Sequence, residues 1–279
     1  PKRPVGVLGW VLSALAVAAL VAAGWFAWSS FDRVRRSETE LARAAELLEN
    51  AEDDLVLVDD AVQTEIGSTV ATITLEAVDL ADSVRADAAE ASGVIDGVIG
   101  ILKEDRLAYA TALKDSADAR VEMMELAPEI LATDMKATTA IQYADQAVAE
   151  IKAAEDLSAQ AVAEFNKHNA DGVRASDSYS VQAEARLQAA QSLITSATAS
   201  FEGADFSAFS GYVDAKLSLI ALAKEIDDVW LAGDIAGSNA KLDTYNQRDA
   251  EVVAMAQTLP ASLRYPIAKA YNAETADMS

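Results

Sequence analysis

The strongest constraint in this sequence is an uncharged apolar run at 5–28, which contains no proline and a single hydroxyl side chain, Ser13. As a helix rising 1.5 Å per residue, the run would be about 36 Å long, enough to cross a hydrocarbon core of roughly 30 Å. It is longer than the apolar part of a cleaved signal peptide, and bulky aromatic residues stand where a small-residue cleavage site is expected. We therefore predict one transmembrane helix over 5–28, preceded by a short tail, 1–4.

Two kinds of residue along this run have a predicted role in the membrane. Aromatic rings favour the headgroup layer, and the predicted interfacial anchors are Trp25, Phe26, Trp28 and Phe31. Small residues at helical spacing let a second helix approach closely, and the predicted helix-packing positions are Gly9, Ser13 and Ala16 on one ladder and Ala14, Ala18 and Ala22 on another. An alanine-rich span produces such ladders by composition alone, so the sequence leaves open whether they mark a contact.

The charge of the chain limits its partners. The formal net charge is −23, and most of it lies after the predicted span. Such a surface repels phosphate groups, which excludes nucleic acid as an expected partner and argues against direct binding to anionic lipid. The expected partners are the lipid bilayer, through the span, and other membrane-protein subunits, through the span and the ectodomain.

The orientation of the span is less well constrained, because basic residues flank both of its ends. Lys2 and Arg3 precede it, and Arg33, Arg35 and Arg36 follow it, so the positive-inside rule does not decide. The short basic tail, the acidic bulk and the lack of cysteine favour a cytoplasmic N-terminus. We predict a single-pass protein of the cell membrane with the bulk of the chain outside the cytoplasm.

The rest of the sequence is typical of helix. Alanine makes up about a fifth of the chain, and the five prolines stand at the edges of long segments rich in Ala, Leu, Glu, Lys and Gln. No strand-like alternation bounded by Asn-Gly turns is present. The predicted fold is all-α: one N-terminal transmembrane helix followed by an elongated antiparallel helical bundle with long, coiled-coil-like helices. Pro128 is expected to interrupt the helical segment around it.

A heptad pattern follows the predicted span. Apolar residues recur at alternating steps of three and four, as in an a/d seam, at Leu41, Ala44, Leu48, Ala51, Leu55, Val58, Val62 and Ile66. We predict a stalk helix over 29–66 that continues the span, then one acidic helical-bundle domain over 67–279. Gly67-Ser68 and Ser92–Gly100 are candidate hairpins, and the sequence does not decide between them. The anchor and this seam are the predicted partner surface.

Three later turns share a pattern of helix end, small residues, aspartate and new helix. They are Asn169-Ala170-Asp171, Gly203-Ala204-Asp205 and Ala232-Gly233-Asp234, and each aspartate is expected to cap the following helix. The spacing also suits tetratricopeptide-type hairpins, but here one long helix fills each period, which favours an up-and-down bundle over a solenoid. The tail from Tyr245 is predicted to form a final helix, a proline-marked corner and a short closing helix.

The inventory of chemical groups is poor. The chain has no cysteine, which excludes thiol nucleophiles, disulfides and thiolate metal sites, and His168 is its only histidine, in a predicted turn. Adjacent carboxylates such as Asp227-Asp228 point about 100° apart on a helix and cannot flank a substrate. Asp53 and Asp60 share a helix face, but a solvated stripe is the favoured interpretation over a cation site. We expect no catalytic residue, no cofactor and no metal.

These observations favour a non-catalytic, membrane-anchored extracytoplasmic protein over an enzyme. The first hypothesis is an accessory or scaffold subunit of a larger membrane complex, of a respiratory or transport kind. The alternative is a ligand-binding or sensor-type ectodomain, which would have to signal through a partner because the tail 1–4 is so short. Identification of the chain's membrane partner separates the two.

Overall fold

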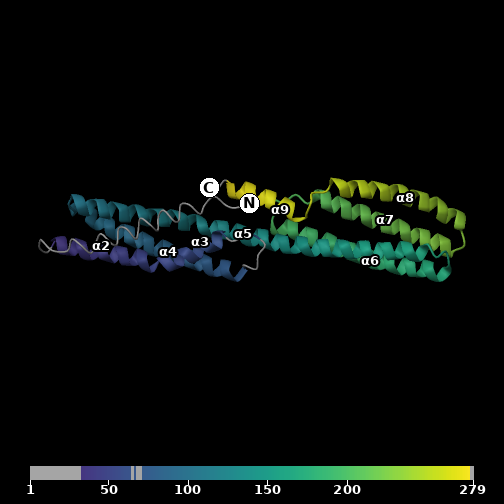
Figure 1. The fold of residues 1–279 in the computed structure, drawn as a ribbon, viewed down its shortest axis with the longest axis horizontal. Coiled ribbons are helices and arrows are strands. Elements are labelled where there is room, and N and C mark those ends of the chain that lie inside the picture. The colour runs from purple at the N-terminus through teal and green to yellow at the C-terminus, as the bar shows by residue number, and fades with distance from the viewer. Residues whose placement is uncertain (1–32, 64–65, 67–70, 277–279) are drawn as a thin grey trace. The chain divides into compact units, whose positions relative to one another are not determined.

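The computed structural model describes residues 33–63, 66 and 71–276, and every regular element in these residues is helical (Figure 1). The elements are α2 (Arg33–Asn50), α3 (Glu52–Gln63), α4 (Ala71–Val98), the 3-10 turn η1 (Ile99–Ile101), α5 (Glu104–Phe165), α6 (Ala170–Ser200), α7 (Ser207–Leu231), α8 (Ile235–Thr258) and α9 (Arg264–Ala276). The predicted all-α class is confirmed.

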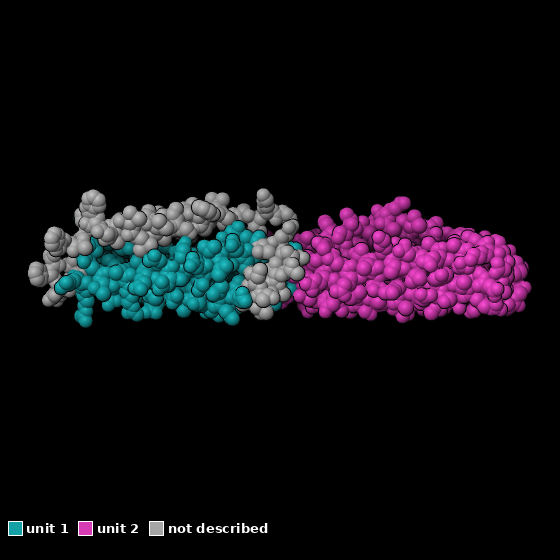
Figure 2. Space-filling view, turned by 60° about the horizontal axis from the view of Figure 1, so that its bottom comes forward, with its two compact units in different colours: residues 1–135, 278 teal, residues 136–277, 279 magenta. Residues whose placement is uncertain are grey.

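The chain divides into two compact units (Figure 2). Unit 1 reaches Met135 and unit 2 begins at Lys136, so α5 contributes its first part to unit 1 and its remainder to unit 2. None of the described helices is both long enough and apolar enough to traverse a bilayer. The predicted span, 5–28, lies outside the described residues.

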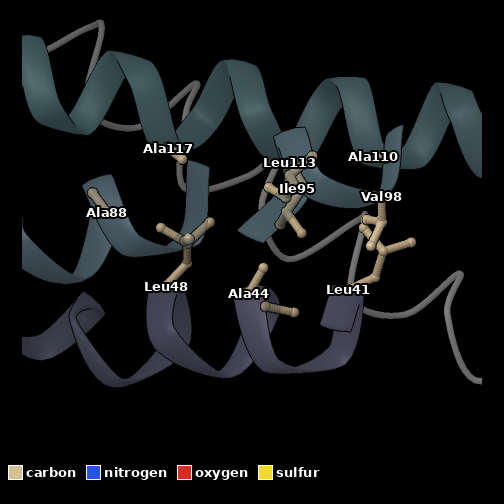
Figure 3. Packing of buried hydrophobic residues seen from close by; sticks show 11 residues of the cluster. Leu41, Ala44, Leu48, Ala88, Ile95, Val98, Ala110, Leu113 and Ala117 are labelled. Atoms are coloured by element: carbon tan, nitrogen blue, oxygen red, sulfur yellow. The ribbon is translucent and has the colours of Figure 1, made fainter. Parts of the chain in front are cut away.

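Unit 1 is a bundle in which α2 and α3 pack on α4 and on the first part of α5. In the close-up, Leu41, Ala44 and Leu48 of α2 point towards side chains of α4 and α5 (Figure 3). Burial of these apolar side chains is worth about 25 cal/mol per Å² of surface removed from water. Alanine recurs at the contacts, and its short side chain lets helix backbones approach closely.

The heptad seam therefore has its partner within the chain. Most of its members are nearly inaccessible: Leu41, Ala44, Leu48, Ala51, Val58 and Val62 are at most 8 % exposed. Leu55 is partly buried against the same core. The seam residues were identified correctly, but the prediction that the seam is a surface for another protein is wrong, because α4 and α5 already cover it.

The helical segment of α2 and α3 is interrupted at Ala51, and an arginine of α5 binds both helices at this break. The last four carbonyls of a helix have no partner within it, and Arg120 donates a hydrogen bond of 2.6 Å to one of them, the carbonyl of Leu48. Its other terminal nitrogen pairs with Glu52, in the first turn of α3. With only 3 % of its side chain exposed, Arg120 joins three helices at one point.

Pro128 lies inside α5 and does not end it, so the predicted interruption is wrong. A proline in a helix interior removes one backbone hydrogen bond and costs about 3 kcal/mol. On either side of it, Met124, Ala127 and Leu131 are buried in the core of unit 1, at 4 % exposure or less. The free energy gained by burying these side chains exceeds the cost of the proline, so the helix continues past residue 128.

Unit 2 consists of the remainder of α5 with α6, α7, α8 and α9, and the three predicted turns separate its helices. Asp234 caps α8 by accepting a hydrogen bond from the Gly237 backbone, as predicted. Asp205 accepts one from the Ser207 backbone at the start of α7. The cap of α6 differs from the prediction: Asn169 accepts from the Gly172 backbone, and Asp171 lies in the first turn instead.

Two glycines at or beside these turns occupy positions that disfavour a side chain: Gly172, in the first turn of α6, and Gly233, after α7. A Cβ at Gly172 would lie 2.5 Å from the carbonyl oxygen of Glu164, so the end of α5 approaches the start of α6 too closely for a side chain. Gly233, after the end of α7, has φ +85°, which favours glycine at a helix C-terminus.

Helix α9 closes unit 2 beside the turn between α6 and α7. The Arg264 guanidinium donates to both oxygens of Asp145 on α5, at 2.8 and 2.5 Å. Ile267 and Tyr271 are buried, as are the turn residues Phe201 and Phe206. The predicted sequence of a helix, a proline-marked corner and a short closing helix is confirmed.

Candidate contact groove

A groove of about 380 Å³ lies on unit 2, where α5, α7 and α8 come together. Its lining consists of Glu155, Tyr212, Lys216, Val252, Val253, Ala256 and Gln257. Tyr212 and Lys216 stand one turn apart on α7, and the α8 residues occupy two successive turns, so helical spacing brings both sets to the same groove. Val252 is nearly fully buried, whereas Val253 is 50 % exposed.

Glu155 is the common partner of the polar contacts at the groove. The Tyr212 hydroxyl donates a hydrogen bond of 2.8 Å to its Oε1, and the Lys216 ammonium lies 3.4 Å from the same oxygen. Lys216 Nζ also lies 5.4 Å from the centre of the Tyr212 ring, within cation–π range. The three side chains form one network that ties α5 to α7.

The electrostatics of this network keep the Tyr212 hydroxyl in its protonated form. Burial raises the pKa of the Tyr212 hydroxyl, and the hydrogen bond to Glu155 and the nearby charges of Glu155 and Asp249 raise it further. At neutral pH the hydroxyl stays protonated and donates to the carboxylate. The groove offers an apolar floor, an ion pair and the Gln257 amide, which can hold a side chain of a partner or a small amphipathic molecule.

A second groove, of about 620 Å³, lies between α5 and α6. Arg186 on α6 donates to both carboxylate oxygens of Glu150 on α5, at 3.2 and 3.1 Å. Both side chains are partly exposed, and surface ion pairs of this kind contribute at most about 1 kcal/mol. The first groove, with its buried tyrosine, is the better defined of the two.

The residues that the sequence analysis singled out lie partly outside and partly inside the described part of the chain. The helix-packing positions from Gly9 to Ala22 and the anchors from Trp25 to Phe31 lie outside the described residues. His168 lies in the turn after α5, exposed and at φ 51°, with its ring edge-on to Phe165. Within 33–63, 66 and 71–276, no three His, Cys, Asp or Glu side chains are arranged to hold a metal ion.

The sequence did not point to the groove, because its residues come from three helices that only the fold brings together. The four-residue step from Tyr212 to Lys216 is the only local signal, and such steps occur throughout a helical chain. Asp227 was noticed, but only as half of a chance pair with Asp228. The structure separates the two: Asp227 is 1 % exposed, whereas Asp228 faces solvent.

Comparison with protein-family models, with curated proteins and with solved structures found no match to this chain.

Proposed function

We propose that this chain is a non-catalytic, membrane-anchored protein that acts outside the cytoplasm as an accessory or scaffold subunit of a larger membrane complex, of a respiratory or transport kind. The observation that carries the proposal is the apolar run at 5–28, which precedes two units of packed helices. Under this proposal the run forms the single transmembrane helix and the described helices form the extracytoplasmic bundle. The span and the groove on unit 2 are the proposed contact surfaces.

The groove supports this proposal because it combines exposed apolar surface with fixed polar groups. Protein contact sites share that composition: an apolar centre with a polar rim. The same groove supports the alternative of a ligand-binding or sensor-type ectodomain, since its volume is within the range of small-molecule sites. The two proposals predict different partners for the purified protein: another membrane protein under the first, and a small molecule under the second.

Mild-detergent purification of the tagged full chain tests the main proposal. We expect a stoichiometric complex with at least one other membrane protein. Gly9→Leu with Ser13→Leu should release the chain from that complex if the small residues of the span pack on a partner helix, because the larger side chains keep the helices apart. Val253→Glu should weaken the complex if the groove contributes, whereas Val181→Glu, at a similarly exposed valine of α6, should not.

The outcomes are distinct. If the double leucine variant keeps its partner, the ectodomain alone holds the complex. A lone monomer or homodimer that binds a small molecule, with binding lost in Val253→Glu, would replace the main proposal with the sensor-type alternative.

The proposed orientation has its own test, which the lack of cysteine makes simple. We expect Glu202→Cys, at an exposed position after α6, to react with a membrane-impermeant maleimide in intact cells. Reaction only after the cells are lysed would place unit 2 in the cytoplasm and reverse the proposed orientation.

A further inference from the structure

A buried carboxyl group lies near the end of α7, between α6 and α8. Asp227 is 1 % exposed, and burial at this level is rare for an aspartate that has no cationic partner. Two buried serines come from the neighbouring helices: Ser176 of α6, at 4 % exposure, and Ser238 of α8, at 1 %. The site belongs to unit 2 alone and is separate from the groove at Tyr212.

The hydrogen bonds at this site leave one carboxyl oxygen unsatisfied. Ser176 hydrogen-bonds to the Asp227 side chain, while the Ser238 hydroxyl donates to the backbone carbonyl of Ile226, at 3.4 Å. Asp227 Oδ2 has no hydrogen-bond partner among the described residues. A buried carboxylate with one hydrogen bond is costly, and protonation removes most of that cost.

The surrounding charges favour the protonated form as well. Asp177 on α6 and Asp228 on α7 both raise the pKa of Asp227, although burial is the larger cause and the Ser176 hydrogen bond acts against it. Cations of the adjoining helices are engaged with other carboxylates: Lys224 of α7 with Glu184, Lys241 of α8 with Glu225, Arg174 of α6 with Asp171, and Lys167 after α5 with Glu164. His168, in the turn between α5 and α6, is exposed and contacts Phe165.

We propose that Asp227 is a proton-binding site that makes the packing of α6, α7 and α8 sensitive to pH: the helices are held together while the carboxyl is protonated and loosen when it ionises towards neutral pH. The pKa of this group is about 6 in the folded chain, against an ordinary value of 3.8. The stability due to the proton is therefore complete below about pH 4 and is lost as the pH rises through about 6.

The variant that tests the proposal is Asp227→Asn, which keeps the shape of the side chain and cannot ionise. We expect the wild-type unfolding equilibrium constant, divided by that of the variant, to rise about a hundredfold between pH 4 and 7.5. Urea unfolding of the full chain in detergent, followed by far-ultraviolet circular dichroism, measures this ratio. Asp228→Asn is the matched control: it removes the charge of the exposed neighbour, a smaller cause of the raised pKa of Asp227 than burial, and should keep most of the wild-type dependence on pH.

A second measurement does not depend on the variant folding. Hydrogen exchange of the wild-type chain, read by mass spectrometry and corrected for intrinsic rates, should show extra opening in the end of α7 and the start of α8 as the pH rises from 4.5 to 7.5. Parallel stability curves for wild type and Asp227→Asn, or equal protection of these segments at both pH values, would overturn the proposal.

Discussion

Replacing Arg120 with alanine is expected to lower the free energy of unfolding of unit 1 by about 3 kcal/mol. The guanidinium is 3 % exposed and bonds the Leu48 carbonyl and the Glu52 carboxylate. Its removal leaves the carbonyl without its donor at the break between α2 and α3 and deprives Glu52 of its cation. Glu52 is 31 % exposed and regains some solvation, which keeps the cost below that of a fully buried lone charge.

Chemical unfolding followed by circular dichroism measures this effect, and hydrogen exchange at the end of α2 locates it. Arg120→Lys should recover only part of the loss, because one ammonium does not reproduce the two-pronged geometry of a guanidinium. Arg85→Ala is the matched control: its pair with Asp82 is exposed, and we expect a change of at most about 0.5 kcal/mol. If Arg120→Ala costs no more than this control, Arg120 does not hold the break together.

The second large effect is expected at Leu131, whose replacement by alanine should lower the free energy of unfolding by roughly 2–5 kcal/mol. Leu131 is fully buried and packs in a cluster with residues of α3 and α4. Alanine there loses the apolar burial of the larger side chain and leaves a cavity that stiff helices fill poorly.

The control for this substitution lies on the same helix. Leu126, five residues earlier in α5, is 39 % exposed, so Leu126→Ala removes the same atoms with little loss of packing. We expect it to cost less than about 1 kcal/mol. Equal losses in the two variants, measured by urea unfolding of the full chain, would show that burial of Leu131 in the core does not set the stability of this part of α5.

Much of the helical framework could be predicted from local signals. The turns at 166–169, 201–206 and 232–234 follow from small residues and capping side chains, which act within one turn of helix. Pro128 shows where local reasoning fails: its penalty is real, but buried neighbours on both sides exceed it. The heptad seam shows a second limit, because an apolar stripe has the same pattern whether it packs on its own chain or on another protein.

The candidate sites depended still more on the fold. Tyr212, Lys216 and Glu155 meet only because α7 packs beside α5, and no sequence spacing relates the three. Asp227 and Asp228 are adjacent and chemically identical, yet one is buried with an unsatisfied oxygen and the other is solvated. The rotation of about 100° per residue places them on different faces of the helix. Which of these faces packs against the other helices is decided only by the packed bundle.

By itself, the sequence determined that the described part of this chain is helical and where most of its later helices end, because propensity, capping and turn chemistry act over a few residues. It also identified the residues of the seam, most of which are buried. Only the tertiary structure decided what covers that seam, which cation joins α2 to α3 and which carboxyl loses its solvent. Those outcomes depend on desolvation and on contacts between helices distant in sequence, and such contacts exist only once the bundle has packed.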